Sequence, residues 1–388
     1  MDPRLRLRDQ RKHQFQQIVH HPYFGFVLLG GLMLFVQLIQ SLGVAIPVSI
    51  MRAFGLTMIY IVIGLGFAIL LGYAGLASLG TAGFVGIGTY ALGYLTNARG
   101  FSVGMVVFYS VLGAIILGVV VGFISLRIEG MYLAIITLGL SEILNEIFKN
   151  AVTITNGTNG LLMPQLVFFG TYYTVSNETV FAAIAVVLVL MMFFTFNIIK
   201  SPTGRAMLAM KNSESAAQAM GVSVLKYRLL AFIIATVFAL VGGILYMSYI
   251  RYTIPTTWSL AFSLNLLAAV IVGGSRSIWG IVLGSFMIFG LDLAVFQRII
   301  VTPDRNAAIA AFIERFPEHQ EALRTFFVNL QQSLPVITYI LNGLLIILVV
   351  MFYPGGLYQL VLTIKTKLVT AWKNAVRKWK VRRYGQEV

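Results

Sequence analysis

The stretch from residue 53 to residue 98 is predominantly apolar and contains no Asp, Glu, Lys or Arg. A helix that crosses the hydrocarbon core of a bilayer needs roughly 20 such residues, so the stretch is too long for one crossing. We expect a break at GYAGLASLGTAG, residues 72–83, where four glycines and several small polar residues interrupt the apolar pattern. Irregular backbone at membrane depth is tolerated only where protein or water surrounds it, so this segment should pack closely inside the molecule.

The composition of the whole chain is typical of a polytopic membrane protein. Of its 388 residues, 59% are apolar and 11% are charged, whereas soluble domains carry about 25% charged residues. The chain has no cysteine, which excludes disulfides, zinc–thiolate sites and cysteine nucleophiles. Its four histidines lack metal-ligand spacing, and no nucleophile–base arrangement is evident, so we expect neither a metal site nor a catalytic centre.

Hydropathy predicts an all-α protein with about ten transmembrane helices and discontinuous segments. The candidate spans are 24–46, 54–72, 81–97, 102–124, 131–148, 179–199, 229–250, 259–273, 278–299 and 335–353. The chain then divides into a basic N-terminus at 1–23, a transmembrane domain at 24–353 and a basic tail at 354–388. No signal peptide is expected, because the basic start leads into a full-length apolar span without a cleavage site.

The distribution of basic residues predicts the orientation of the chain. With ten spans, one side of the membrane receives 20 of the 28 Lys and Arg residues, including those of both termini and of residues 200–228. The positive-inside rule places that side in the cytoplasm. The basic residues flank apolar spans, so the net charge of +15 indicates topology and contact with anionic lipid rather than nucleic-acid binding.

Two sizeable loops fall on the opposite side, at 149–178 and 300–334. The second has helical periodicity, with apolar residues separated by acids and arginines and divided by Pro317. This pattern predicts two short amphipathic helices at the outer surface of the membrane. A docking platform for a partner is the alternative interpretation.

The run SPTGRAMLAMKNSESAAQAMGVSVLKYR, residues 201–228, carries much of the charge in the middle of the chain. Pro202 suits a first helical turn, Asn212 or Ser213 suits a helix N-cap, and Gly221 suits a helix end. The sequence therefore predicts two short helices parallel to the membrane, with alanines that allow close approach of a partner. An ordinary solvated connector is the alternative, although connectors are usually shorter and less structured.

Within this run, ESAAQAMG (214–221) resembles the coupling-loop signature of ABC importer permeases, which reads Glu-Ala-Ala, three residues and Gly. Ala216, Ala217 and Gly221 keep that spacing, whereas Glu214 stands one residue early. Residues 50–300 and 335–357 resemble the LivM-like branch of the branched-chain amino acid ABC permease family, notably in GYAGLASLGTAGFVGIGTYALGYL and FYPGGL. The segment GGSRSIWG departs from the family's Gly-Leu-Gly pattern and introduces Arg276.

The resemblance implies a transport subunit of the bacterial cytoplasmic membrane that imports branched-chain or related small amino acids. It also implies a second homologous permease, two ATP-binding cassette subunits and an extracytoplasmic binding protein as partners. The chain has no G-x4-G-K-[ST] phosphate loop, so ATP and Mg²⁺ are expected on the ATPase chains. Contact with the ATPase is expected from residues at or near the coupling loop: Arg205, Glu214, Ala216, Ala217, Gly221 and Arg276.

Other functions remain open at this point. Related permeases carry urea, amides or nucleosides, because the binding protein largely sets the choice of substrate. An ion-coupled secondary transporter is a further alternative, but its usual inverted repeats and midplane charges are not evident. A scaffold or sensor that kept the fold without transport is the third.

Polar residues inside the spans are candidates for the translocation pathway. The set comprises Tyr73, Ser78, Thr81, Thr137, Glu142, Asn145, Asn265 and Asp292. Glu142 matches a recurring acid of the family, with interhelical hydrogen bonding as its alternative role. Glu146 and Lys149 stand three residues apart near the end of the same span and are expected to form an ion pair.

Overall fold

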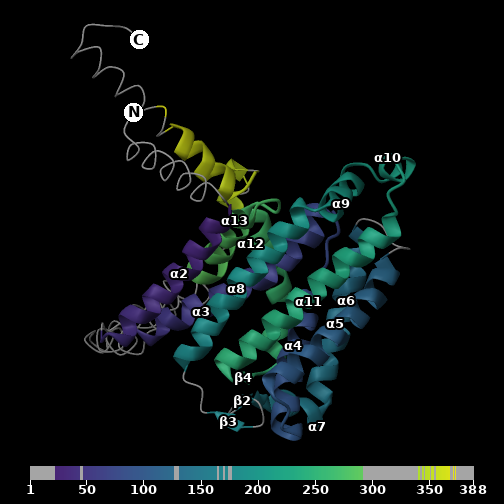
Figure 1. The fold of residues 1–388 in the computed structure, drawn as a ribbon. Helices are drawn as coiled ribbons and strands as arrows, with labels where there is room; N and C mark the ends of the chain where they lie inside the picture. Colours follow the sequence, from purple (N-terminus) through teal and green to yellow (C-terminus); the bar gives the residue numbers. More distant parts are fainter. Residues whose placement is uncertain are drawn as a thin grey trace, which may run out of the picture.

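The computed structural model describes residues 22–43, 47–125, 131–163, 166–168, 171–173 and 177–291, and short pieces between 340 and 372. Most of these residues are helical (Figure 1). The predictions that concern Asp292, the 300–334 insert and most of both basic termini lie outside the described residues.

Long helices form most of the bundle: α2 Pro22–Ser41, α3 Val48–Ala68, α4 Thr81–Arg99, α5 Val103–Ser125, α6 Met131–Asn150, α8 Asn177–Lys200 and α11 Val224–Ile250. Shorter helices lie between and after them: α7 Val152–Thr155, α9 Pro202–Asn212, α10 Glu214–Ala219, α12 Leu260–Gly273 and α13 Ile278–Ser285. Two π-helical segments extend α3 and α13, namely η1 Ile69–Tyr73 and η4 Phe286–Gly290, and the 3-10 turns are η2 Gly157–Asn159 and η3 Pro255–Trp258.

Five helices in the described part of the chain are long and apolar enough to cross a membrane: α2, α3 with η1, α5, α8 and α11. Helix α12, and α13 with η4, are apolar but shorter. The prediction of a mostly helical polytopic membrane protein is therefore confirmed. The count of ten spans stays a prediction.

The expected break in the uncharged stretch is present, since η1 ends at Tyr73, α4 begins at Thr81 and residues 74–80 are not helical. The preceding span starts at Val48 rather than at the predicted residue 54. The difference arises at Arg52, which lies one turn inside α3 with an exposed side chain. A long basic side chain near a helix end can reach water while its stem covers apolar surface, so a single arginine does not end the helix.

The loop at 149–178 is not purely irregular, and four short strands qualify the all-α prediction. Strand β1 Leu161–Leu162 pairs antiparallel with β4 Tyr252–Thr253, which follows α11. Strand β2 Leu166–Phe168 pairs antiparallel with β3 Thr171–Tyr173. These strand pairs satisfy backbone hydrogen-bonding groups of the loops at one end of the bundle. A hydropathy pattern does not reveal such pairing between loops.

Helix α3 lies at the centre of the bundle and packs against α8, α11, α12 and α13. Every residue from Gly55 to Ala68 is buried, including Thr57 and Tyr60, which carry hydroxyl groups. A helix that is apolar on all sides belongs in the interior of a large helical assembly, and the burial of α3 fits that rule.

Helices α12 and α13 form a tight hairpin, and their close approach requires glycine at the contact. An added Cβ at Gly284 would overlap the carbonyl oxygen of Ala269 and the backbone of Gly273. The obstructing atoms belong to the main chain, so a change of side-chain rotamer would not relieve the overlap. Close approach of two helix backbones through small residues is a common packing mode inside membranes.

We expect Gly284→Val to lower the free energy of unfolding by about 2–3 kcal/mol, in the range of an overpacked core. The matched control is Gly113→Val in α5, where nothing lies within 4 Å of an added Cβ. Thermal melting of the purified protein in detergent measures both effects. Equal melting temperatures for the two variants would contradict the tight hairpin.

The bundle has two distinct ends (Figure 1). Helices α9 and α10 stand at one end, where the side chain of Tyr73 in η1 also meets the turn at 274–277. Helix α7 and the strands lie at the other end. The ion pair predicted between Glu146 and Lys149 is confirmed at the end of α6, with 2.7 Å between Lys149 Nζ and Glu146 Oε1.

Candidate functional site

The break between η1 and α4 exposes backbone amides that no helix satisfies, and hydroxyl groups bond to them. Two of these hydroxyls belong to α6 and one to α12, so three helices meet at the start of α4. The bonds are Leu79 N to Thr137 Oγ1 (2.9 Å), Ala82 N to Ser263 Oγ (3.0 Å), Gly83 N to Ser141 Oγ (3.2 Å) and Gly80 N to Ser78 Oγ (3.3 Å). The first amides of a helix need such partners, and water is absent from the hydrocarbon core.

Three sequence-predicted residues therefore gather at this break: Ser78, Thr81 and Thr137, all of them buried. The sequence analysis did not single out Ser141 and Ser263 as site residues. Ser141 follows Thr137 by four residues and so shares its face of α6, which is a signal that could have identified it. For Ser263, nothing local to its apolar helix distinguishes it.

Two further predicted residues bond within the chain. The hydroxyl of Tyr73 donates to the carbonyl oxygen of Arg276 at 2.8 Å. The amide of Asn145 donates to the carbonyl oxygens of Pro255 (3.0 Å) and Trp258 (3.1 Å), and its side chain is almost fully buried. Asn145 thereby holds η3 on α6. Its place in the translocation pathway stays a prediction.

Glu142 and Asn265 differ from this group because both are exposed. They lie on α6 and α12, next in sequence to the exposed Ile143 and Leu264. We call these four residues the α6–α12 face. A carboxylate and an amide within helices of a membrane protein are costly to leave against lipid, so this face requires a protein or aqueous neighbour.

The predicted pair of short helices at 201–228 is present as α9 and α10. Ser201 Oγ accepts a hydrogen bond from Gly204 N, and Pro202 occupies the first turn of α9. Of the two candidate caps for the second helix, the structure uses Ser213, whose Oγ accepts from Ala216 N. Gly221 follows α10 with φ of +81°, the left-handed conformation that favours glycine after a helix.

Glu214 faces its own chain in the structure. Its Oε2 lies 2.5 Å from Nη2 of Arg228, whose side chain is only 9% exposed. This ion pair joins α10 to the start of α11. Contact between this carboxylate and an ATPase stays a prediction, and Arg228 was not among the predicted site residues.

Lys211, near the end of α9, was also missed. Its Nζ donates to the carbonyl oxygens of Leu71 and Gly72, each at 2.9 Å. These carbonyls belong to the end of η1, where unpaired carbonyl groups carry partial negative charge. Burial, reinforced by the neighbouring Arg276 guanidinium, lowers the pKa of Lys211 below its usual value.

The predicted contact residues of α10 separate into buried and exposed groups. Ala217 is only 4% exposed and packs within the chain, so it does not belong to a free surface. Ala216 and Ala219 are exposed, Met220 is 86% exposed, and nothing lies within 4 Å of an added Cβ at Gly221. We call these four exposed residues the α10 tip. Arg205 and Arg276 are exposed at the same end, and Arg205 donates to the carbonyl oxygen of Lys200.

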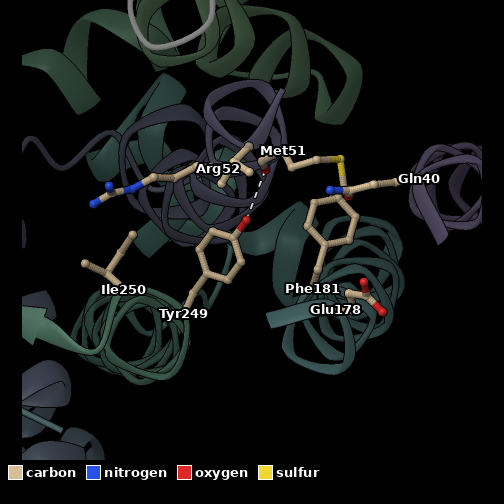
Figure 2. A pocket seen from close by; sticks show the side chains of 8 residues that line it. Gln40, Met51, Arg52, Glu178, Phe181, Tyr249 and Ile250 are labelled. Carbon is tan, nitrogen blue, oxygen red and sulfur yellow. Dashed lines mark hydrogen bonds between the residues drawn. The ribbon is translucent and has the colours of Figure 1, made fainter. Parts of the chain in front are cut away.

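A cavity of about 440 Å³ lies between α2, α3, α8 and α11. Figure 2 shows its two charged residues, Arg52 and Glu178, on opposite sides, with Tyr249 and Phe181 between them. The hydroxyl of Tyr249 donates to the carbonyl oxygen of Met51 at 3.1 Å. The charged groups do not converge on one ligand, and the cavity lies apart from both the α10 tip and the α6–α12 face.

A family model described as "Branched-chain amino acid transport system / permease component" matches residues 49–350. The chain is similar to the high-affinity branched-chain amino acid transport system permease protein LivM of Escherichia coli (strain K12), with 32% identity over 282 residues. That match covers 66% of this chain and 66% of the relative, so the chain spans about two thirds of its length.

LivM of Salmonella typhimurium is 31% identical with the same coverage. A probable branched-chain amino acid transport permease protein LivM of Methanocaldococcus jannaschii is 25% identical over 265 residues, which cover 58% of this chain and 75% of the relative. No solved structure matches the chain.

The ion pair between Glu214 and Arg228 leads to an asymmetric prediction. Glu214→Leu leaves the cation of Arg228 buried without its partner, and we expect it to lower stability by about 2–3 kcal/mol. Arg228→Met leaves a carboxylate that is already 34% exposed to solvent, so we expect a loss of only about 1 kcal/mol. Thermal melting of the two variants beside the native protein checks the order, and the reverse order would contradict this view of the pair.

Proposed function

The chain belongs to the permease family of branched-chain amino acid transport systems, and on that premise we propose that it is one membrane subunit of an ATP-driven importer for branched-chain or related small amino acids. The α10 tip carries the proposal. It presents Met220, an apolar side chain that is 86% exposed, at the end of the bundle that the basic residues assign to the cytoplasm. An exposed apolar side chain at the end of a capped helix can insert into an apolar groove of a cytoplasmic partner.

That partner is an ATP-binding cassette subunit in this proposal. The sequence lacks the G-x4-G-K-[ST] loop that cradles phosphates, so ATP and Mg²⁺ bind to two separate ATPase chains. The permease subunit itself carries no catalytic role. Both termini and the α9–α10 segment face the cytoplasm, and the protein resides in the bacterial cytoplasmic membrane.

The α6–α12 face is assigned to a second, homologous permease chain. A partner chain would cover Glu142 and Asn265, which otherwise stand exposed on α6 and α12. The translocation pathway would then run between the two chains, with these polar side chains on its wall. Few polar groups line it, which suits transient and weak contact with a passing amino acid.

An extracytoplasmic binding protein would dock at the opposite end of the bundle, where α7 and the strands lie. It delivers the amino acid to a cavity between the two permease chains. ATP-driven closure of the ATPases beneath α10 then moves the helices as rigid bodies and opens the cavity to the cytoplasm.

Changes at the α10 tip test the ATPase contact. In a complex co-expressed with the ATPase subunits of the same transport system, we expect Met220→Glu to lower the amount of co-purified ATPase about tenfold, because it places a charge in an apolar groove. The matched control is Val152→Glu, which changes an exposed apolar residue of α7 at the opposite end. Equal retention of the ATPase by both variants would refute the assignment.

Replacement of Glu142 tests the pathway. In proteoliposomes that contain the whole complex, we expect Glu142→Gln to lower ATP-dependent leucine uptake about tenfold, as for loss of one charged hydrogen-bond partner, with ATPase retention unchanged. Glu146→Gln is the matched control, since Glu146 lies one turn further along α6 and pairs with Lys149. Uptake without ATP or without a binding protein would overturn the importer proposal itself.

A further inference from the structure

The end of η1 is held from two sides by segments at the cytoplasmic end of the bundle. From one side, Lys211 of α9 donates to the carbonyl oxygens of Leu71 and Gly72, each at 2.9 Å. From the other side, the Tyr73 hydroxyl donates to the carbonyl oxygen of Arg276 at 2.8 Å. The backbone of Ser275 also packs against Gly72, where an added Cβ would overlap it.

Lys211 makes further contact with the break itself. Its aliphatic stem packs on Gly75, where an added Cβ would lie 3.0 Å from Lys211 Cγ and 3.4 Å from Lys211 Cβ. Gly75 has φ of +75°, a left-handed backbone conformation that favours glycine. The ammonium group and the stem of one lysine therefore contact both the end of η1 and the beginning of residues 74–80.

The helix that carries Lys211 is itself firmly attached. Met207 and Met210 of α9 are buried in the chain, and α9 packs against α8, α10 and α11. The ion pair between Glu214 and Arg228 joins α10 to α11. A displacement of the α10 tip would therefore move α9, and with it Lys211, as one body.

The end of the break and the start of α4 are bonded to the helices of the α6–α12 face. Leu79 N bonds to Thr137 of α6, and Ala82 N bonds to Ser263 of α12. Only the two ends of residues 74–80 bond to helices, since Ala74 N and Leu76 N bond back to η1 and Phe84 N of α4 bonds to Gly80 O. The segment between them can absorb a change in backbone angles more easily than the helices on either side. Contacts thus run without interruption from the α10 tip through Lys211 and the break to α6 and α12.

We propose that Lys211 is a positioning residue for transport: its ammonium group ties α9 to the break, so that movement of the docking helices repositions the helices that carry Glu142 and Asn265. The inference rests on the proposed function of the chain as an importer subunit. Lys211 need not contact either the substrate or the ATPase. A cation is suited to this task because two carbonyl groups at a helix end accept from it at the negative end of the helix dipole.

The first test compares ATP hydrolysis with leucine uptake in the reconstituted complex. We expect Lys211→Met, which keeps a stem of similar length but no donor, to lower uptake about tenfold while ATP hydrolysis stays within about twofold, as for loss of charge-assisted hydrogen bonds. Lys211→Arg retains the charge and donors and is expected to recover most of the uptake. The matched control is Lys226→Met, which removes an exposed lysine at the same end.

A covalent link provides an independent test that does not depend on how well Lys211→Met folds. The native chain has no cysteine, so an introduced pair can form only one intramolecular disulfide. The separation of 3.4 Å between a Cβ built at Gly75 and Lys211 Cβ is close to the range of about 3.5–4.5 Å found in disulfides. We expect Lys211→Cys alone to uncouple uptake from hydrolysis, and the oxidised double variant Gly75→Cys/Lys211→Cys to restore coupling that a reductant abolishes.

The controls separate this inference from the function on which it rests. If the native complex takes up leucine with ATP but Lys211→Met does so equally well, the positioning role is wrong and the importer proposal stands. It is also wrong if Gly75→Cys/Lys211→Met, which cannot form the disulfide, takes up leucine as well as the oxidised variant Gly75→Cys/Lys211→Cys. The same holds if oxidation leaves the latter variant uncoupled. If the native complex shows no ATP-dependent uptake at all, the proposed function fails first.

Discussion

The structure depends on satisfying the backbone where a buried helix is interrupted inside a membrane protein. Residues 74–80 leave amides without helical partners, and hydroxyls of Thr137, Ser141 and Ser263 accept from the amides at the start of α4. Because these hydroxyls come from α6 and α12, the bonds that satisfy the break also fix the relative positions of three helices. At the opposite end of the break, Lys211 bonds to the last carbonyl groups of η1, so α9 and the interior helices meet at one irregular segment.

The exposed side chains of the helices are of two kinds, apolar and charged, and the two suit different surroundings. Helix α5 exposes apolar residues such as Phe108 and Ile116, which is what a bilayer accommodates. Helix α6 exposes Glu142 among apolar neighbours, which a bilayer accommodates poorly. The chemistry of the exposed residue, rather than the extent of exposure, therefore distinguishes a surface suited to lipid from one suited to another protein chain.

Local sequence patterns predicted the elements well and their mutual contacts poorly. Glycine and serine content located the break at 72–83, and capping residues located α9 and α10, because both effects act within a few residues of the chain. The bond from Lys211 to Leu71 joins residues 140 positions apart, and no periodicity signals it. The inward direction of Ala217 and Glu214 was also hidden, since a helix as short as Glu214–Ala219 has no hydrophobic period from which to infer its faces. The predicted span began at residue 54 and left out Arg52, because hydropathy does not register a side chain that reaches past the helix end.

The internal bonds of the α9–α10 segment have a consequence for association. Ser201 and Ser213 cap the two helices, Glu214 pairs with Arg228, and Lys211 bonds to η1, all within the chain itself. The exposed residues Met220 and Gly221 are thus held on an ordered support before any partner arrives. A preorganised surface loses little conformational entropy when it binds, so even a small contact area can give useful affinity. The residues that determine how tightly this surface binds would then include several that the partner never touches.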